Sequence, residues 1–507
     1  MLNPARKGRG CSLRKAPMAL AGRAHLNGAR NIRLYPVEFL IVDGRAAVFC
    51  AVYCLPADVT RLGCDMLTVF GRTHGVCGGT RREFLSAGAV GMGALTLPAL
   101  LRADTANSKK SPKSVIYVVL SGGMSHIDTW DPKPDAPAEY RGEFGTIPTA
   151  LPGVRMTDQF PQLAKHLDRF ALLRGVKSVE NDHFLSEVYT GLPRTSGQRP
   201  AFGSVASRLL GSDQLPAYVS LNRNSGDRFE FEHPHYAGPT HAPFRPYGEA
   251  LQNLTPVKDL ATLDDRKALL SGFDTMRREL DASGAAAGMD KFQAQAFDLL
   301  TSAKALQAFD LSKESPKTLD RYGRGKYTHQ AVKTLLYDWE PKPFVLARRL
   351  VEAGVRVVTL SVGSWDHHSG ADQHIFESYR HCLPALDRSV TALVDDLTER
   401  GLIDDVLVVV LGEFGRTPKL SYPGPGREHW ADAGAILMAG GGLKTGLVVG
   451  ETDSRAERAK SGNINFQNVV GTIYHVLGID PTTSLPDFTG RSQYLLDHAD
   501  PVKELVG

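Results

Sequence analysis

Acidic and histidine side chains recur directly after three apolar segments of the chain. Carboxylate oxygens and imidazole nitrogens together form the mixed ligand set that Zn²⁺, Mn²⁺ or Fe bind in proteins. The sequence therefore predicts a divalent metal site, with zinc as the first expectation and manganese, calcium or magnesium as alternatives. The three groups are Asp128 in the first, Trp365-Asp366-His367-His368 in the second, and Glu413 with the later His429 in the third.

Three of these residues are the first candidates for metal ligands. Asp366 and His368 are two positions apart, so they point the same way if the segment is extended. A third ligand from another part of the chain, His429, would complete the set. Taken singly, each histidine is more often a hydrogen-bonded residue than a ligand, and Asp128 lies in a turn-rich loop that favours Asp for structural reasons. The second group of candidates is Glu413, Asp128 and His367.

Two further residues are candidates for direct action on a substrate. His183 follows Asn181-Asp182 just before a helical segment, and a helix N-terminus there would suit an anionic ester. His183 would bind metal, attack the substrate or donate a proton. The alternative is that Asn181 or Asp182 merely caps the helix. Arg416 is the candidate for holding the substrate anion, because its fork matches a phosphate or sulfate.

The surrounding segments predict an α/β fold with a mostly parallel, doubly wound sheet and helices on both faces. Residues 115–120, 355–360 and 406–411 are apolar and β-branched, as buried parallel strands are. Helical patterns precede the second and third strands, which favours right-handed crossovers. In such a sheet the carboxyl ends of the strands form the ligand crevice, and this is where the candidate residues fall. Weaker strands are expected at 170–173 and 435–439, helices at 344–353, 375–400 and 466–477, and a loop and helical insertion at about 222–337.

Composition limits the classes of partner. The chain has 507 residues, of which 42% are apolar and 22% charged, as in globular proteins. Residues 1–103 hold 14 Lys and Arg against 5 Asp and Glu, and since the whole chain carries +4, residues 104–507 carry −5. A mildly acidic body argues against a nucleic-acid partner. Cys382 is alone in that body, so no internal disulfide is expected there.

The start of the chain contains a predicted export signal. Arg81-Arg82 precedes a short, weakly apolar and Gly-rich segment, which is typical of a twin-arginine signal and too weak for a stable transmembrane anchor. We expect residues 66–106 to be this signal, recognised by the twin-arginine export machinery, and residues 107–507 to be periplasmic or extracellular. Residues 1–65 precede a second methionine, Met66, and are expected to be poorly ordered and absent from the working protein.

The sequence also resembles a known family over residues 66–507. It is similar to the exported bacterial family catalogued as "domain of unknown function 1501", which is in turn similar to the alkaline phosphatase and sulfatase superfamily. The resemblance implies a parallel-sheet fold that binds one or two divalent metals at strand ends and cleaves phosphate or sulfate esters. Its motifs are the leader, Ser121-Gly122-Gly123 through Asp131-Pro132-Lys133-Pro134, Trp365-Asp366-His367-His368, Gly412-Glu413-Phe414-Gly415-Arg416-Thr417-Pro418 and Arg427-Glu428-His429-Trp430.

Site residues implied by this resemblance match only in part. Asp366, His429 and either His368 or His367 correspond to one metal site. Asp128 and Glu413 are the residues that would rebuild the second site, whose usual pattern is disrupted, and no Ser, Thr or Cys stands where the nucleophile is expected. The resemblance therefore favours a metal-dependent hydrolase that uses water, acting on a small anionic ester or a sulfated or phosphorylated glycan. The alternatives are a non-catalytic anion- or glycan-binding protein on the same fold, and a cell-surface scaffold without metal.

The export hypothesis predicts where the mature chain begins. N-terminal sequencing of the exported protein should give a start close to Ala103 or Ala106, where small residues meet a polar segment. A mature chain that still contains Arg6 to Arg61 would contradict both the signal and the proposed start at Met66.

Overall fold

The structure is a computed structural model, and its described residues fall into two separate units. They are residues 40–42, 46–48, 113–211, 215–222, 231–246, 303–323, 325–328, 336–339, 342–370 and 374–507. The units are Met1–Lys109 and Lys110–Gly507. In the first, Leu40–Val42 (β1) pairs antiparallel with Ala46–Val48 (β2). The twin-arginine segment at 66–106 and the rest of residues 1–65 lie outside the described residues, so their assignments stay predictions.

The second unit is built on a seven-stranded sheet with the strand order β15-β6-β14-β11-β3-β10-β7. All neighbouring strands are parallel except where β14 pairs antiparallel with β11 and with β6. The predicted mostly parallel sheet is therefore confirmed. Its strands are Ser114–Val119 (β3), Ala171–Val176 (β6), Tyr218–Ser220 (β7), Val357–Ser361 (β10), Val406–Leu411 (β11), Gly434–Gly440 (β14) and Leu447–Val449 (β15).

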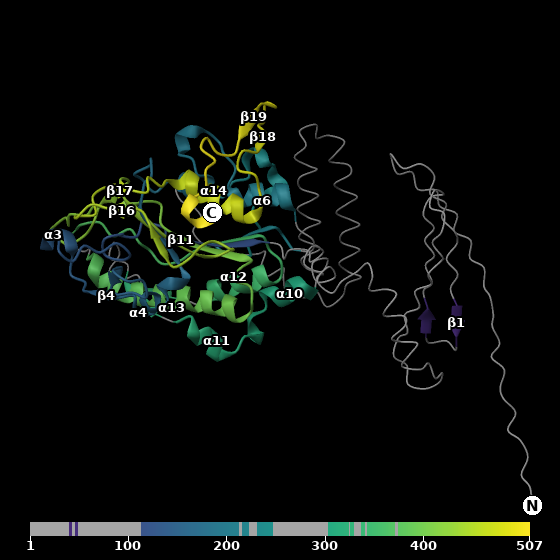
Figure 1. The fold of residues 1–507 in the computed structure, drawn as a ribbon, viewed down its shortest axis with the longest axis horizontal. Coiled ribbons are helices and arrows are strands. Elements are labelled where there is room, and N and C mark those ends of the chain that lie inside the picture. Colours follow the sequence, from purple (N-terminus) through teal and green to yellow (C-terminus); the bar gives the residue numbers. More distant parts are fainter. Residues whose placement is uncertain are drawn as a thin grey trace, which may run out of the picture. The chain divides into compact units, whose positions relative to one another are not determined.

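Both faces of the sheet are apolar and both are covered by helices. Along β3, Ile116 and Val118 pack into one hydrophobic cluster, whereas Val115 and Tyr117 pack into the other. This is the alternation that a strand buried on both sides requires. The predicted helical layers on both faces are thus confirmed (Figure 1). One face carries Pro161–Lys165 (α4), Lys342–Glu352 (α12) and Ile375–Glu399 (α13), and the other carries Ser186–Thr190 (α5), Phe202–Leu210 (α6) and Phe466–Leu477 (α14).

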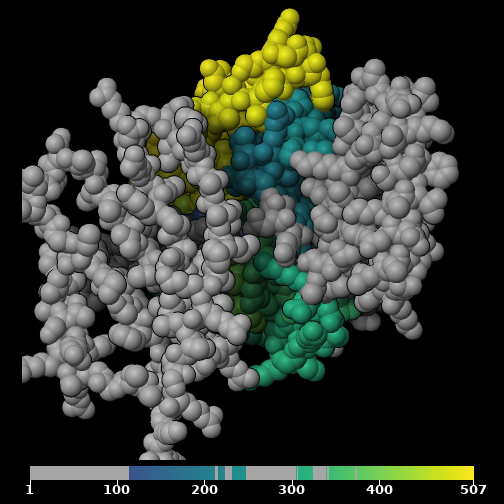
Figure 2. All heavy atoms as spheres, turned by 90° about the vertical axis from the view of Figure 1, so that its right-hand side faces the viewer, coloured from purple at the N-terminus to yellow at the C-terminus, as the bar shows by residue number. Residues whose placement is uncertain are grey.

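The insertion is only partly as predicted. Ala303–Phe309 (α10) and Pro316–Arg321 (α11) are helical, as expected. However, Gly325–Thr328 (β8) and Leu336–Trp339 (β9) form an antiparallel hairpin where helix was predicted. The α10 and α11 segment, in green, and the C-terminal residues, in yellow, lie at opposite ends of the face seen in Figure 2. Residues 247–302 lie outside the described residues.

No helix among the described residues is long and apolar enough to cross a membrane.

Short elements complete the second unit. The short elements are Ala138–Arg141 (α3), Lys503–Val506 (α15), Thr146–Pro148 (β4), Arg155–Thr157 (β5), Gly415–Arg416 (β12), His429–Trp430 (β13), Glu451–Thr452 (β16), Ala459–Ser461 (β17), Ser484–Pro486 (β18) and Ser492–Tyr494 (β19), with 3-10 turns at Leu167–Arg169, Arg194–Ser196, His235–Ala237, Pro239–His241 and Leu311–Lys313.

The register of the three central strands brings their carboxyl ends together. Val119, near the end of β3, is paired with Ser361 of β10 on one side and with Leu411 of β11 on the other. The loops that follow these strands therefore leave the sheet at the same level. Because the strands are parallel, residues that follow them in the sequence meet at one edge.

A buried carboxylate from α13 caps the start of α4. The two oxygens of Asp387 accept hydrogen bonds from the backbone N–H groups of Gln162, at 2.9 Å, and Leu163, at 2.7 Å. Helix α4 has no side-chain cap of its own. Burial raises the pKa of Asp387 to about 6, although the two backbone hydrogen bonds and the nearby Lys165 oppose this.

This carboxylate predicts a specific dependence of stability on pH. Its folded-state pKa lies above the unfolded value, so the folded protein binds more protons and its stability falls as pH rises from about 4 to about 6. Asp387→Asn removes this titration but keeps one acceptor. The free energy of unfolding of wild type relative to Asp387→Asn, measured in urea, should fall over that interval and level off above about pH 7. A difference that rises with pH would contradict the assignment.

Candidate metal centre

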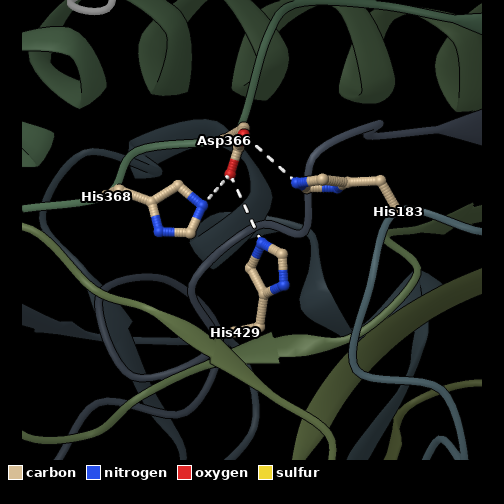
Figure 3. Close-up of side chains that lie close together, drawn as sticks. All are labelled: His183, Asp366, His368 and His429. Carbon is tan, nitrogen blue, oxygen red and sulfur yellow. Dashed lines mark ion pairs between the residues drawn. The ribbon is translucent and has the colours of Figure 1, made fainter.

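Three imidazoles converge on one carboxylate at the carboxyl edge of the sheet. The nitrogen and oxygen atoms that His183, Asp366, His368 and His429 can offer to a metal all lie within 4.8 Å of one another. The Nε2 atoms of His368, His183 and His429 lie 2.8, 3.1 and 3.7 Å from the Asp366 carboxylate. Figure 3 shows the three rings approaching the carboxylate from different sides.

Three different parts of the fold bring these four residues together. Asp366 and His368 follow β10, and both reach the cluster, as their spacing of two predicts for an extended segment. His429 lies in β13, which pairs with β12 directly after β11. His183 lies between β6 and α5. The structure therefore brings together the three first-choice ligands and His183.

All three imidazoles present Nε2 to the centre and hold Nδ1 against a hydrogen-bond acceptor. Histidines that bind metals commonly donate their second ring N–H to a carboxylate or a backbone carbonyl, which fixes the tautomer and the ring orientation. The cluster has this arrangement before any ion is considered. The acceptors are the Glu413 carboxylate for His183, at 2.9 Å, the Glu428 carboxylate for His368, and the carbonyl oxygen of Asn181 for His429, at 2.9 Å.

The charges of the cluster favour a positive centre. Burial opposes ionisation of Asp366, but the three histidines and Arg416 outweigh it and hold the pKa of this carboxyl well below its usual range. Burial lowers the pKa of His183, yet its hydrogen bonds to Asp366 and Glu413 raise that pKa to about 9. Contact with Asp366 also raises the pKa of His368, against a smaller effect of burial. Protonated imidazoles or a bound cation can supply the charge that these acids attract.

The donor set fits a divalent ion. Zinc bound at 2.0–2.2 Å in a tetrahedral site has its ligand atoms about 3.4 Å apart. The three contacts between the imidazoles and the two oxygens of Asp366, at 2.8–3.7 Å, lie around that value, and the four donor atoms all lie within 4.8 Å of one another. In addition, Nε2 of His429 is buried and makes no hydrogen bond within the described part of the chain. Its contact with Asp366, at 3.7 Å, is too long for a hydrogen bond, and a metal ion would provide the closer partner that a buried nitrogen needs.

Arg416 does not occupy the position expected of a residue that holds a substrate anion. Its side chain is fully buried and donates to the backbone carbonyls of Gly122, Gly123 and Arg427. The remaining contact is with Asp366 Oδ1, at 2.6 Å from Nη2. The fork is thus taken up by the protein, because the strand ends leave carbonyl groups that need donors. In this structure Arg416 positions Asp366.

Asp128 and His367 are not brought to the cluster. Asp128 is buried and forms a two-point ion pair with Arg427, while Ser125 donates a further hydrogen bond to it at 2.6 Å. Asp128 therefore has a structural role, but its main partner is the distant Arg427, and only the bond from Ser125 is the local loop contact that was expected. His367 is buried with its ring against Tyr379, at 5.3 Å between centroids, because the alternation that turns its neighbours toward the cluster turns it away.

Glu413 and the cap predicted near His183 also differ from expectation. Glu413 contacts Nδ1 of His183, on the far side of the ring from the cluster, and accepts a hydrogen bond from the Gly122 N–H at 2.7 Å. Helix α5 begins at Ser186 after Leu185 and has no side-chain cap, so Asn181 and Asp182 do not cap it. Sequence reasoning gave no role to Glu428, although this residue belongs to the Arg427-Glu428-His429-Trp430 motif and precedes a predicted ligand.

The comparison with protein families agrees with the sequence motifs. The family described as "Protein of unknown function (DUF1501)" matches residues 112–506. The chain belongs to this family. The predicted membership of DUF1501 is thus confirmed. No curated protein sequence matches the chain.

Several solved structures resemble this DUF1501 protein at low identity. The PsFucS1 sulfatase from Pseudoalteromonas sp. is 11% identical, with a TM-score of 0.33, over 75% of this chain and 70% of that chain. The lipoteichoic acid synthase LtaP from Listeria monocytogenes is 11% identical, with a TM-score of 0.33, over 78% and 76%. The phosphonate monoester hydrolase SpPMH from Silicibacter pomeroyi is 13% identical, with a TM-score of 0.30, over 73% and 74%. At these values the likeness assigns no activity to this chain.

One glycine is required beside Asp366. Gly122 has a φ of +109°, and a Cβ atom there would lie 2.4 Å from the backbone nitrogen of Asp366 and 2.9 Å from the carbonyl carbon of Trp365. Gly153 has a φ of +79°, but a Cβ atom there would meet nothing within 4 Å. The two positions therefore share an unfavourable φ and differ in the space available.

Alanine at these two positions should separate strain from crowding. Gly153→Ala should cost about 1–2 kcal/mol of stability, the penalty of a left-handed conformation. Gly122→Ala should cost about 1–3 kcal/mol more, because the backbone before Asp366 must move. Urea unfolding of both variants measures the difference. Equal losses would show that the strand end can shift without resistance.

Proposed function

We propose that this protein is an exported, metal-dependent hydrolase of phosphate or sulfate esters. The observation that carries the proposal is the convergence of three Nε2 atoms and one carboxylate at the edge of the sheet, each imidazole being held by an acceptor on Nδ1. His183, Asp366, His368 and His429 would hold a divalent ion, with zinc favoured by the nitrogen-rich set. The bound ion would supply Lewis-acid chemistry toward the ester.

The chain's own residues support this role in distinct ways. Asp366 remains ionised, because its neighbours hold its pKa well below the usual range. Arg416 orients that carboxylate from a buried position, at 2.6 Å. The converging group consists of three histidines and one aspartate, and no Cys of the described part of the chain belongs to it. Attack by water on a small anionic ester, or on a phosphorylated or sulfated glycan, is the reaction that fits these residues.

A second candidate is a non-catalytic protein that binds anions or glycans. The observation that favours it is the number of donors, because four protein ligands complete a tetrahedral shell, as in structural zinc sites. A catalytic site needs an open position, so activity requires five-coordination or the release of one ligand. Nε2 of His429, at 3.7 Å from Asp366, is the most loosely placed of the three nitrogens.

Export is the remaining part of the proposal. The twin-arginine motif in residues 66–106 supports a periplasmic or extracellular location and passage through the twin-arginine machinery. This route carries folded proteins, so the metal would be loaded before export.

Metal content and hydrolysis together test the function. Purified wild type should contain about one equivalent of divalent metal and hydrolyse aryl phosphates or aryl sulfates. Replacing both Asp366 and His429 by Ala should abolish metal binding and reduce turnover to about 1% or less, because two of four ligands are lost. His498→Ala, at an exposed histidine, is the matched control and should change neither.

The outcomes distinguish the candidates. Wild type with neither metal nor turnover would contradict the proposal. Metal binding without turnover, combined with affinity for a sulfated or phosphorylated glycan, would select the non-catalytic alternative. A thermal midpoint that chelators leave unchanged would count against a bound metal in either case.

A further inference from the structure

Two carboxylates stand behind the cluster, each in contact with the outer nitrogen of an imidazole. Glu413 contacts His183 Nδ1, and Glu428 contacts His368 Nδ1. Neither belongs to the converging group of possible ligands. The question is therefore what role a carboxylate has when it contacts Nδ1 of an imidazole whose Nε2 faces the cluster.

Glu428 is held in place by more than the imidazole. One of its oxygens contacts His368, while the other accepts from the backbone N–H of Ser369, at 3.1 Å, and from the Ser369 hydroxyl, at 2.9 Å. Its own N–H donates to the Thr417 hydroxyl at 2.9 Å. The side chain therefore ties the segment after β10 to the segment between β12 and β13, and the direction of the His368 ring is fixed from both.

Glu413 is held more deeply. Its side chain is only 2% exposed, against 40% for Glu428. The same oxygen that contacts His183 Nδ1, at 2.9 Å, also accepts the Gly122 N–H, at 2.7 Å. A buried carboxylate is destabilising unless hydrogen bonds and nearby positive charge compensate it, so the position of Glu413 demands a reason.

The charges give that reason. Asp366, Glu413 and Glu428 are acids, and Arg416 is the one permanent cation in contact with this group among the described residues. If the imidazoles are neutral, the three acids and Arg416 together carry a net charge of −2, which a divalent ion neutralises. Neutral imidazoles also require a proton on Nδ1 if Nε2 is to bind the ion, and an acid facing Nδ1 stabilises that tautomer.

We propose that Glu413 and Glu428 are positioning residues that fix His183 and His368 as Nδ1–H tautomers and thereby set the affinity of the site for its divalent ion. This inference rests on the proposed metal centre and assigns its control to residues outside the ligand set. His429 differs, because a backbone carbonyl does the same task there and no side-chain substitution removes it.

Zinc affinity of the single variants tests this assignment. Glu413→Gln and Glu428→Gln should each weaken zinc binding about 10- to 100-fold, measured by competition with a chromophoric chelator. The loss should be larger for Glu413→Gln, because the low dielectric around a buried carboxylate strengthens its hydrogen bond. Both variants keep the size of the side chain and one acceptor oxygen.

Matched controls separate positioning from stability. Glu352→Gln removes an acid of the same 40% exposure, which pairs with Arg348 and lies at the end of α12, before β10 begins. Asp387→Asn removes a buried acid from α13. Both should alter urea stability without changing zinc affinity.

A spectroscopic signature tests the tautomers directly. In zinc-loaded protein labelled with ¹⁵N-histidine, wild type should show Nδ1–H protons for His183, His368 and His429. Glu428→Gln should shift the Nδ1–H signal of His368 alone, and Glu413→Gln that of His183 alone. A loss of packing would instead disturb all three signals.

Each outcome bears on one proposal. If wild type binds no divalent metal, the metal centre itself fails. If wild type binds zinc and both Gln variants bind it within about twofold of wild type, the metal centre stands and the positioning role is wrong. Equal losses in the Gln variants and in Glu352→Gln would also overturn it, since general stability would then account for the effect.

Discussion

The parallel register of β3, β10 and β11 is the constraint on which the site depends. The three strands end at the same level, with Val119 paired to Ser361 and to Leu411. Backbone carbonyls at such an edge need donors, and charged side chains in the following loops need partners. Asp366 and Arg416 satisfy each other there, and the imidazoles gather on the same carboxylate. The cluster at this edge therefore follows from the register that places the carboxyl ends of the three strands at the same level.

Strands and helices were predictable where the hydrophobic pattern extended over six or more residues. The six-residue apolar segment of β11 and the twelve-residue helix α14 were predicted with their observed bounds, because hydrophobic pattern and length agree. The strands β7 and β15 have three residues each, and so short a segment carries no periodicity. The hairpin of β8 and β9 was mistaken for helix because its neighbours in the insertion are helical.

The site was predictable in its ligands and less so in the surroundings of those ligands. Spacing of two placed Asp366 and His368 on one side of an extended segment, and the structure agrees. The partners of charged residues could not be predicted in this way. Arg427 lies 299 positions from Asp128, and nothing local indicates that they form a pair. Arg416 donates its hydrogen bonds to the backbone carbonyls of Gly123 and Arg427. These bonds depend on the fold of turns distant from Arg416 in the sequence, and no sequence motif predicts them.

The small ladder of β12 and β13 links this edge to the order of pairing. Arg416 is directly opposite His429, and Gly415 is opposite Trp430. A slip of the pairing by one residue would turn His429 to the other face of the ladder and place Trp430 opposite Arg416. An indole would then stand where the imidazole is needed. The length of the loop that joins these strands is therefore constrained. An insertion or deletion in the loop leaves the centre intact only if Arg416 and His429 remain paired.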